Sequence, residues 1–409
     1  MGDINSFAAR GFDWRLFAGE EAIEDRLKEL VIRAGAKRPF VICSKSISSK
    51  TRNIERIKGA LGDSFAGYFD GIEIDSTYNS VMAATEAARE AGADLLISVG
   101  GGSVIVATRV IDIFLCEEGD PFEIMTQYPE GKPAYSPRLN APKLPIINVI
   151  TTPTGAMNRG GSGLANPDLD QRMEYFDPKT RPIGLIFDHE SILDSPYELF
   201  RSTATTGFAG SVAAVAVPSN PLVEGDKEHI LRLLKRGYLG IHENPDDIGP
   251  RMDLCVAALL GNRVQDDGEQ VRGRQNPATQ AFSGNYAIST ALHIRYPHVW
   301  QGESTSVLTA TVARRSPAPD LETARRVAQA MDVWATGMSA EDAKLAIADG
   351  IEDLYKKVGM PTRISELNIP KEDFPEIAKE TIKVFNFNSG LRDADQALQG
   401  AIDLMEAAW

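Results

Sequence analysis

The chain has 409 residues, 43% of them hydrophobic and 24% charged, and a formal net charge of −14. This length exceeds what one ordinary hydrophobic core needs, so we expect two domains. The acidic balance disfavours binding to nucleic acid or to an anionic membrane, and no apolar run approaches the roughly 20 residues that span a bilayer. Cys43, Cys116 and Cys255 lie far apart in apolar segments. This spacing indicates free thiols and predicts a cytoplasmic protein without a signal peptide.

The first part of the chain alternates strand and helix patterns. Short apolar runs predict buried strands at 39–43, 66–69, 95–99, 145–150 and 182–188. Amphipathic or Ala-rich segments between them predict helices at 20–34, 51–61, 78–91 and 103–116. This alternation implies a parallel sheet with helices on its faces. The segment 127–142 is rich in Pro, Tyr and Gly and predicts a loop, and 160–179 predicts a hairpin or excursion.

After Asp188 the pattern changes to helices. Mostly Ala-rich segments with helical spacing occur at 199–217, 226–240, 250–260, 278–292, 305–314, 321–331 and 340–358. No strong strand pattern follows. We therefore predict an α/β domain over 1–189 and an all-α helical domain over 190–409.

The most informative segment is the turn that follows the predicted strand 95–99. Gly100, Gly101 and Gly102 come next, then Ser103, and then an apolar stretch with helical spacing. Consecutive glycines between a strand and a helix let the backbone approach a phosphate, while the free N–H groups of the helix N-terminus face the anion. The alternative is a glycine-rich turn without a ligand.

The chain resembles the iron-containing (group III) alcohol dehydrogenases and the related maleylacetate reductases along nearly its whole length. The resemblance rests on motifs in family order, at residues 100–103, 150–155, 182–190, 204–208 and 358–367. It implies an N-terminal dinucleotide-binding domain, a C-terminal helical domain and an active site in the cleft between them. It also implies that Gly100, Gly101, Gly102 and Ser103 wrap the cofactor pyrophosphate, with hydroxyls supplied by Thr151, Thr152 and Thr154.

The family's metal ligands are missing from this sequence. Family members hold a divalent metal with one Asp and three His; here the matching positions are Ala209, Ala213, Ser289 and Gln301. None of these side chains supplies an anionic or imidazole ligand. A divergent, metal-independent member is therefore expected, in which hydrogen-bond donors or cations act on the developing alkoxide.

Two histidines are candidates for this role. His293 matches a family histidine that lies near the nicotinamide without binding the metal, and His298 follows on a predicted loop. The structural alternative for each is an ordinary hydrogen-bonded or surface histidine. Arg172 falls where the family has a lysine; it is a candidate for cofactor phosphate or an anionic substrate, or else a solvated turn residue.

Cofactor choice is predicted from the strand end at 43–45. The family has an acidic residue there that selects NAD, but this chain has Ser44 followed by Lys45. Loss of the carboxylate removes repulsion of a 2′-phosphate. The prediction is NADP or NAD, with a mild preference for NADP, and no metal.

The function predicted first is a metal-independent NAD(P)-dependent reductase or dehydrogenase acting on a small carbonyl or alcohol. An anionic substrate would use an arginine among Arg159, Arg172, Arg263 and Arg295. The alternatives are a non-redox enzyme (lyase, isomerase or cyclase) on the same scaffold and a non-catalytic nucleotide-binding protein. The expected partners are a small-molecule substrate and a second copy in a homodimer, with no nucleic acid and no membrane.

Overall fold

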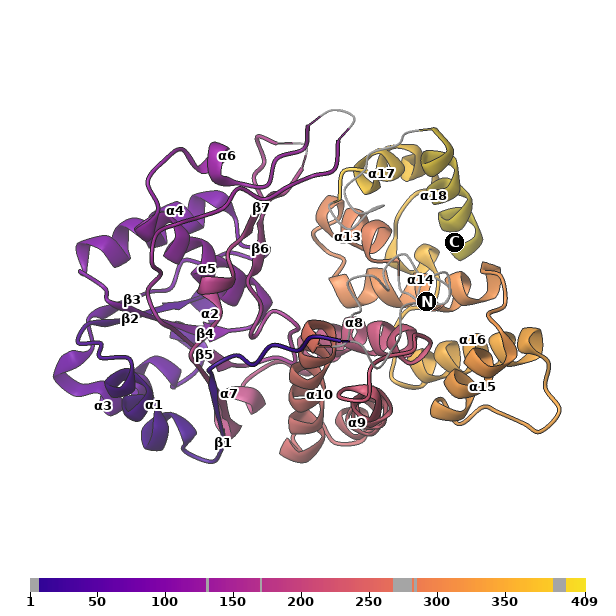
Figure 1. Cartoon of the computed structure of the whole chain (residues 1–409), viewed down its shortest axis with the longest axis horizontal. Helices are drawn as coiled ribbons and strands as arrows, with labels where there is room; N and C mark the ends of the chain where they lie inside the picture. The colour runs from indigo at the N-terminus through magenta and orange to yellow at the C-terminus, as the bar shows by residue number, and fades with distance from the viewer. Residues whose placement is uncertain (1–6, 130–131, 170, 268–281, 283–284, 385–394) are drawn as a thin grey trace. The chain divides into compact units, whose positions relative to one another are not determined.

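The computed structural model describes all residues except 1–6, 130–131, 170, 268–281, 283–284 and 385–394 (Figure 1). The chain forms two compact units, Phe12–Pro196 and Tyr197–Trp409, the latter with the segment Met1–Gly11. The first contains a parallel sheet with helices, and the described part of the second has helices without strands. This confirms the predicted fold class. In the described part of the chain, no helix is long and apolar enough to cross a membrane.

The parallel sheet has six strands in the order β1-β8-β5-β4-β2-β3. Their bounds are β1 Arg15–Gly19, β2 Pro39–Cys43, β3 Gly67–Phe69, β4 Leu95–Gly100, β5 Ile146–Ile150 and β8 Gly184–Asp188. Cys43 is in register with Val99, and Gly100 with Ile150. The carboxyl ends of β2, β4 and β5 therefore meet at one edge, where open α/β sheets bind their ligands.

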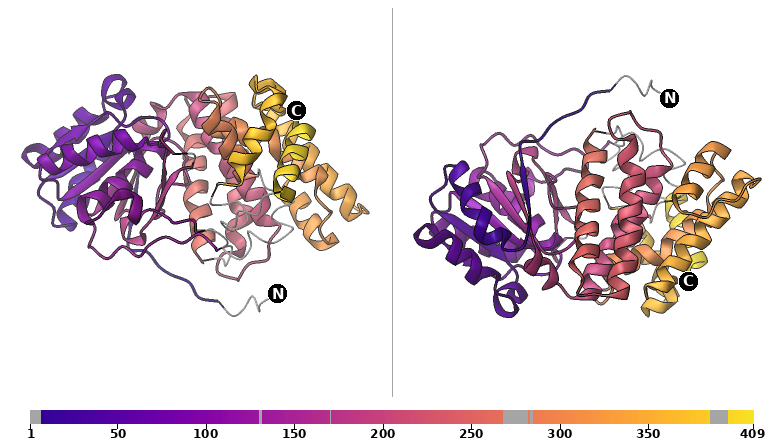
Figure 2. Two further views of the ribbon diagram at one scale, coloured as in Figure 1. Left: turned by 90° about the horizontal axis from the view of Figure 1, so that it is seen from above. Right: turned by 90° about the horizontal axis from the view of Figure 1, so that it is seen from below.

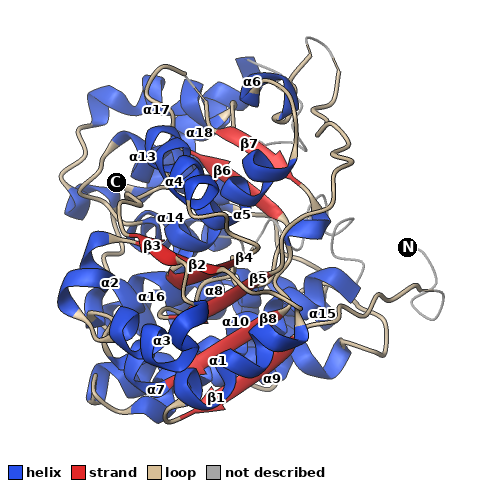
Figure 3. Cartoon of the chain, turned by 90° about the vertical axis from the view of Figure 1, so that its left-hand side faces the viewer, coloured by secondary structure: helices blue, strands red, loops and turns tan. Residues whose placement is uncertain are grey.

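Helices cover both faces of this sheet (Figure 3). Since strand side chains alternate, Val41 enters the core beneath α1 (Ala22–Arg33) and α3 (Asn53–Leu61). Its neighbour Ile42 enters the opposite core, beneath α4 (Tyr78–Glu90) and α5 (Gly102–Cys116). The remaining elements are α2 Lys45–Lys50, α6 Pro121–Ile124, α7 His189–Leu193 and an antiparallel hairpin of β6 (Gly161–Leu164) with β7 (Met173–Phe176). The hairpin confirms the prediction for 160–179.

The second unit is a bundle of helices (Figure 2). Its described helices are α8 Tyr197–Val215, α9 Glu224–Glu243, α10 Ile248–Asp267, α13 Tyr286–Arg295, α14 Gln301–Arg315, α15 Leu321–Ala330, α16 Ala340–Lys357, α17 Phe374–Thr381 and α18 Asp395–Ala408. The predicted helix 278–292 begins largely outside the described residues. Short 3-10 turns lie at Gly62–Ser64 and Pro178–Thr180 in the first unit and at Ile364–Leu367 and Lys371–Asp373 in the second.

Candidate functional site

The glycine turn between β4 and α5 lies directly against the loop that follows β5. A Cβ on Gly101 would lie 2.7 Å from Thr152 Oγ1, and one on Gly102 would lie 3.2 Å from Thr154 Oγ1. Gly100 has φ +154°, and its Cβ would contact the Val104 side chain at 2.9 Å. The glycines therefore allow two backbone turns to approach each other at the carboxyl edge of the sheet.

This junction fits a phosphate. The 15-residue helix α5 starts after Gly101, which has no side chain to cap the helix. The first backbone amides of α5 therefore point out of the helix end without a capping partner. The Thr152 hydroxyl is buried, and among the described residues it has no hydrogen-bond partner. A buried hydroxyl without a partner beside an uncapped helix N-terminus is what a missing anionic ligand would leave. Gly101, Gly102, Ser103 and Thr152 are therefore the residues suited to hold the pyrophosphate of a dinucleotide.

The threonine loop is fixed from several directions. Asn148 on β5 donates from Nδ2 to the Met157 carbonyl oxygen at 2.7 Å, and Ser195 Oγ donates to the Thr151 carbonyl oxygen at 2.6 Å. Thr154 is held by its own turn, in which its amide donates to the Thr152 carbonyl oxygen at 2.7 Å. Such bonds preorganise the loop, so little ordering cost remains when a ligand binds.

A buried arginine supports the same loop. Arg109 on α5 is 2% exposed and donates from Nη1 to the carbonyl oxygens of Ala156 at 2.6 Å and Arg159 at 2.7 Å, and from Nε to Ser162 Oγ at 2.9 Å. Burial, followed by repulsion from Arg159 and Arg181, lowers the pKa of Arg109 to about 9. Its bonds to neutral oxygens fix the loop and place positive charge beneath it.

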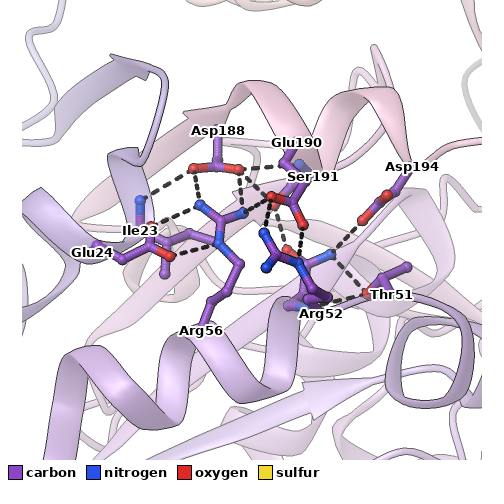
Figure 4. A network of polar contacts seen from close by, with 10 residues as sticks. Ile23, Glu24, Thr51, Arg52, Arg56, Asp188, Glu190, Ser191 and Asp194 are labelled. Carbon is purple, nitrogen blue, oxygen red and sulfur yellow. Dashed lines mark hydrogen bonds and ion pairs between the residues drawn. The ribbon is translucent and has the colours of Figure 1, made fainter.

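An ion-pair network anchors α7, which leads to Ser195 (Figure 4). Arg56, 8% exposed, donates from Nη1 and Nη2 to fully buried Asp188 at 2.7 and 2.8 Å and also pairs with Glu24. Burial alone would raise the pKa of Asp188, but the bonds from Arg56 and from the Ser191 amide outweigh it and lower that pKa. Asp188 also caps α7 by accepting from the Ser191 amide. The end of β8 is thereby tied to the segment that holds the threonine loop.

The predicted adenosine side contains an acid that sequence reasoning missed. Ser44 directly precedes α2 but makes no capping hydrogen bond with its side chain, and its Oγ lies 2.9 Å from Ser46 Oγ. Lys45 Nζ lies 2.9 Å from Asp70 Oδ2, and Ser48 donates to the same oxygen at 2.6 Å. The bonds from Ser48 and Lys45 lower the pKa of Asp70, and the bond to Asp70 raises that of Lys45. Lys45 is therefore not a lone cation, which removes part of the argument for NADP. The sequence signal for Asp70 was its place directly after the strand predicted at 66–69; the pairing of that strand with β2 comes from the structure.

Arg172 lies close to the glycine turn. Its Nη2 donates to the Gly163 carbonyl oxygen at 2.8 Å and to the Asp75 carbonyl oxygen at 3.3 Å. The Asp75 amide in turn donates to Ser103 Oγ at 3.2 Å. Asp75 has φ +60°, so the backbone is turned to make this contact with the first turn of α5. Arg172 is thus connected to the predicted phosphate site through one intervening residue.

The four positions predicted to correspond to the family's metal ligands do not fit a metal. Ala209 and Ala213 are buried on α8, and buried Ser289 on α13 places its Oγ 3.1 Å from Thr305 Oγ1 of α14. Gln301 begins α14. Methyl groups, one hydroxyl and one neutral amide offer neither charge nor imidazole nitrogen to a divalent ion. Within the described ranges, no group of three or more His, Cys, Asp or Glu is arranged to hold a metal.

The two candidate histidines make different contacts. His293 is 6% exposed and its Nδ1 lies 3.0 Å from the Ser289 carbonyl oxygen one helical turn earlier. Because a carbonyl only accepts, Nδ1 carries a proton and proton exchange falls to Nε2. His298 is exposed, its Nε2 lies 3.0 Å from the Leu367 carbonyl oxygen, and its ring meets Tyr296 edge-on. This contact favours an anchoring role for His298.

The four arginines considered as ligands for an anionic substrate differ in their contacts and in the unit to which they belong. Arg263 pairs with Asp226 at 3.6 Å and Arg295 with Glu380 at 2.7 Å. Both belong to the helical unit, and each already has a carboxylate partner. Arg159 and Arg172 belong to the α/β unit and lie near the threonine loop and the glycine turn, respectively. These two are the better placed for an anionic ligand.

Comparison with known proteins gives matches over both units. The family model described as "Iron-containing alcohol dehydrogenase" matches residues 15–189, and that described as "Fe-containing alcohol dehydrogenase family, C-terminal" matches residues 213–397. Maleylacetate reductase 2 of Cupriavidus pinatubonensis is 27% identical over 301 residues, covering 73% of this chain and 74% of that protein. NADP-dependent alcohol dehydrogenase 3 of Entamoeba histolytica is 24% identical over 318 residues, covering 76% and 77%. A crystal structure of 1,3-propanediol oxidoreductase has the same fold, with TM-score 0.82 and 21% identity over 99% of this chain and 100% of that one.

Proposed function

Since the chain belongs to the iron-containing alcohol dehydrogenase family, and is thus an NAD(P)-dependent oxidoreductase, we propose that it reduces a small carbonyl compound, or oxidises the alcohol, without a metal ion. The supporting observation is the contrast between its two sets of residues. The glycine turn and threonine loop suit a dinucleotide, whereas Ala209, Ala213, Ser289 and Gln301 do not suit iron or zinc.

The nicotinamide cofactor supplies the hydride in the reducing direction. The carbonyl oxygen then needs a proton and stabilisation of its developing charge. We assign that proton to His293 Nε2. The Ser289 carbonyl holds Nδ1–H in place, so the imidazolium gives up its Nε2 proton and remains a neutral, hydrogen-bonded ring. The balance is one hydride and one proton added to C=O.

The substrate is proposed to be small and to carry a carboxylate in reach of Arg159 or Arg172. A non-redox reaction on the same scaffold is the second candidate. The observation that favours it is that the four predicted ligand positions hold Ala209, Ala213, Ser289 and Gln301, which suits a changed chemistry as well as a changed proton donor.

The test uses the purified full chain. We expect no stoichiometric iron, zinc or manganese by elemental analysis and unchanged turnover after chelation. We also expect oxidation of NADH or NADPH with a panel of small aldehydes and ketones, with and without a carboxylate. A metal bound at one per chain whose removal abolishes turnover would overturn the proposal. Cofactor binding without oxidation by any carbonyl compound would favour the non-redox candidate.

The role of His293 is tested by H293Q. Loss of a proton donor lowers kcat by about 10²–10⁴-fold, while the dissociation constant for the cofactor changes little. The matched control is H242Q, because His242 lies elsewhere in the helical unit with Nδ1 3.2 Å from the Tyr197 hydroxyl. Equal turnover of H293Q and the unmodified chain would remove His293 from the mechanism.

A further inference from the structure

The ends of two neighbouring strands place one cation and one anion side by side. β2 and β3 are parallel, with Ile42 in register with Phe69. The residues that follow them, Lys45 and Asp70, form an ion pair of 2.9 Å. Lys45 is 78% exposed and Asp70 24% exposed. Both groups therefore remain open to a ligand at the carboxyl edge.

The pair occupies the position where an adenosine ribose is expected. A dinucleotide whose pyrophosphate sits on the glycine turn after one strand places its adenosine ribose at the end of the adjacent strand. Here the glycine turn follows β4, and β2 and then β3 lie next to it in the sheet. The ribose hydroxyls would therefore meet Ser44 first, with Lys45 and Asp70 beside it.

The charge of Asp70 decides what that position accepts. Ser48 Oγ and Lys45 Nζ both contact Asp70 Oδ2, which keeps the carboxylate ionised and fixed. A 2′-phosphate reaching Lys45 would have to displace Asp70 from it and would stand close to another negative group. A ribose with free hydroxyls would instead donate hydrogen bonds to the carboxylate.

We propose that Asp70 is the specificity-determining residue for the cofactor, accepting from the adenosine ribose hydroxyls and opposing a 2′-phosphate, so that the protein prefers NADH to NADPH. This rests on the proposed function, in that a dinucleotide occupies the glycine turn. It reverses the preference predicted from Ser44 and Lys45, because the acid absent from the end of β2 is supplied by the end of β3.

The experiment is a fluorescence titration of NADH and NADPH into the full chain and into D70N, K45M and D63N. The control D63N removes the same charge from an exposed position in the same unit. We expect D70N to bind NADPH about tenfold or more tightly than the unmodified chain does, because one negative charge close to the 2′-phosphate is removed. We expect D70N to bind NADH no better than the unmodified chain does. K45M should weaken NADPH binding, and D63N should change neither dissociation constant.

The outcomes separate the two proposals. If neither dinucleotide binds the unmodified chain, the proposed function fails. If both bind and D70N leaves the ratio of the two dissociation constants unchanged, or shifts it no more than D63N does, the role of Asp70 is wrong while the proposed function stands. Thermal melting of each variant checks that the strand end is intact, and S48A, which removes one support of Asp70, should shift the ratio in the direction of D70N.

Discussion

Replacing Thr152 with valine should stabilise the free protein and weaken cofactor binding at the same time. Thr152 is 2% exposed and its hydroxyl has no partner within the described residues. A buried hydroxyl left unsatisfied costs about 1–3 kcal/mol. Valine has nearly the same shape, so T152V should raise the free energy of unfolding by about 1–2 kcal/mol. For a unit of this size, that corresponds to a Tm higher by about 2–4 °C per kcal/mol.

The same change removes a donor from the phosphate position. A hydrogen bond to a charged group contributes about 1.5–3 kcal/mol, so the dissociation constant should rise by about tenfold to a hundredfold. The assays are thermal denaturation of the ligand-free chain and fluorescence titration with NADH. The matched control is T180V, since the Thr180 hydroxyl is buried in the same unit but donates to the Asp177 carbonyl oxygen at 2.8 Å. T180V should lose stability and keep its affinity. A T152V protein that is less stable than the unmodified chain, or that binds NADH equally well, would refute the reasoning.

Two further predictions concern buried charges in the α/β unit. Burial first raises the pKa of Asp112 from 3.8 to about 7, with Asp177 adding to it and Lys143 and the Leu144 amide opposing it. The folded state thus holds this proton more tightly than the unfolded chain, and stability falls as pH rises from about 4 to 7, by about 4 kcal/mol. Urea unfolding across this range should show a flatter profile for D112N, and parallel profiles would contradict the assignment. R56M leaves the Asp188 carboxylate buried without its ion-pair partner and should lower the free energy of unfolding by about 3–5 kcal/mol. The control R52M breaks an exposed pair with Glu190 and should change the urea midpoint little. Equal losses in the two variants would show that the burial of Asp188 is not the cause.

Sequence periodicity predicted the buried strands well because their side chains are buried on both faces of the sheet and form short continuous apolar runs. β2 has the predicted bounds, and all its residues are buried. The edge strand β1 was missed since its five residues are only partly buried and their pattern is correspondingly weak. The helices α17 and α18 were missed as well. The first is a short helix of eight residues, which gives a weak periodic signal, whereas the second has alanines at helical spacing, such as Ala397 and Ala401, and was overlooked.

The sequence could nominate candidate site residues where one local motif contains them. The glycine turn and the threonines are each contiguous in sequence, and the contact between Gly101 and Thr152 follows from β4 pairing with β5. Asp70 was not predictable in this way. Its pairing with Lys45 depends on which strand neighbours β2, and the residues 66–70 alone do not indicate which strand that is. The support from Arg109 likewise depends on a loop more than forty residues away in the sequence.

The four positions predicted to correspond to the family's metal ligands form a consistent set in the helical unit. Ala209 and Ala213 are 2% and 3% exposed, and Ser289 is fully buried against Thr305. An aspartate at 209 without the three imidazoles and their metal would be a buried carboxylate without a partner, which costs several kcal/mol. Neutral residues at these positions avoid that cost, so the helical unit can fold without an ion. A partial ligand set would keep the desolvation cost without gaining a Lewis acid, and for this physical reason the four positions are expected to change together.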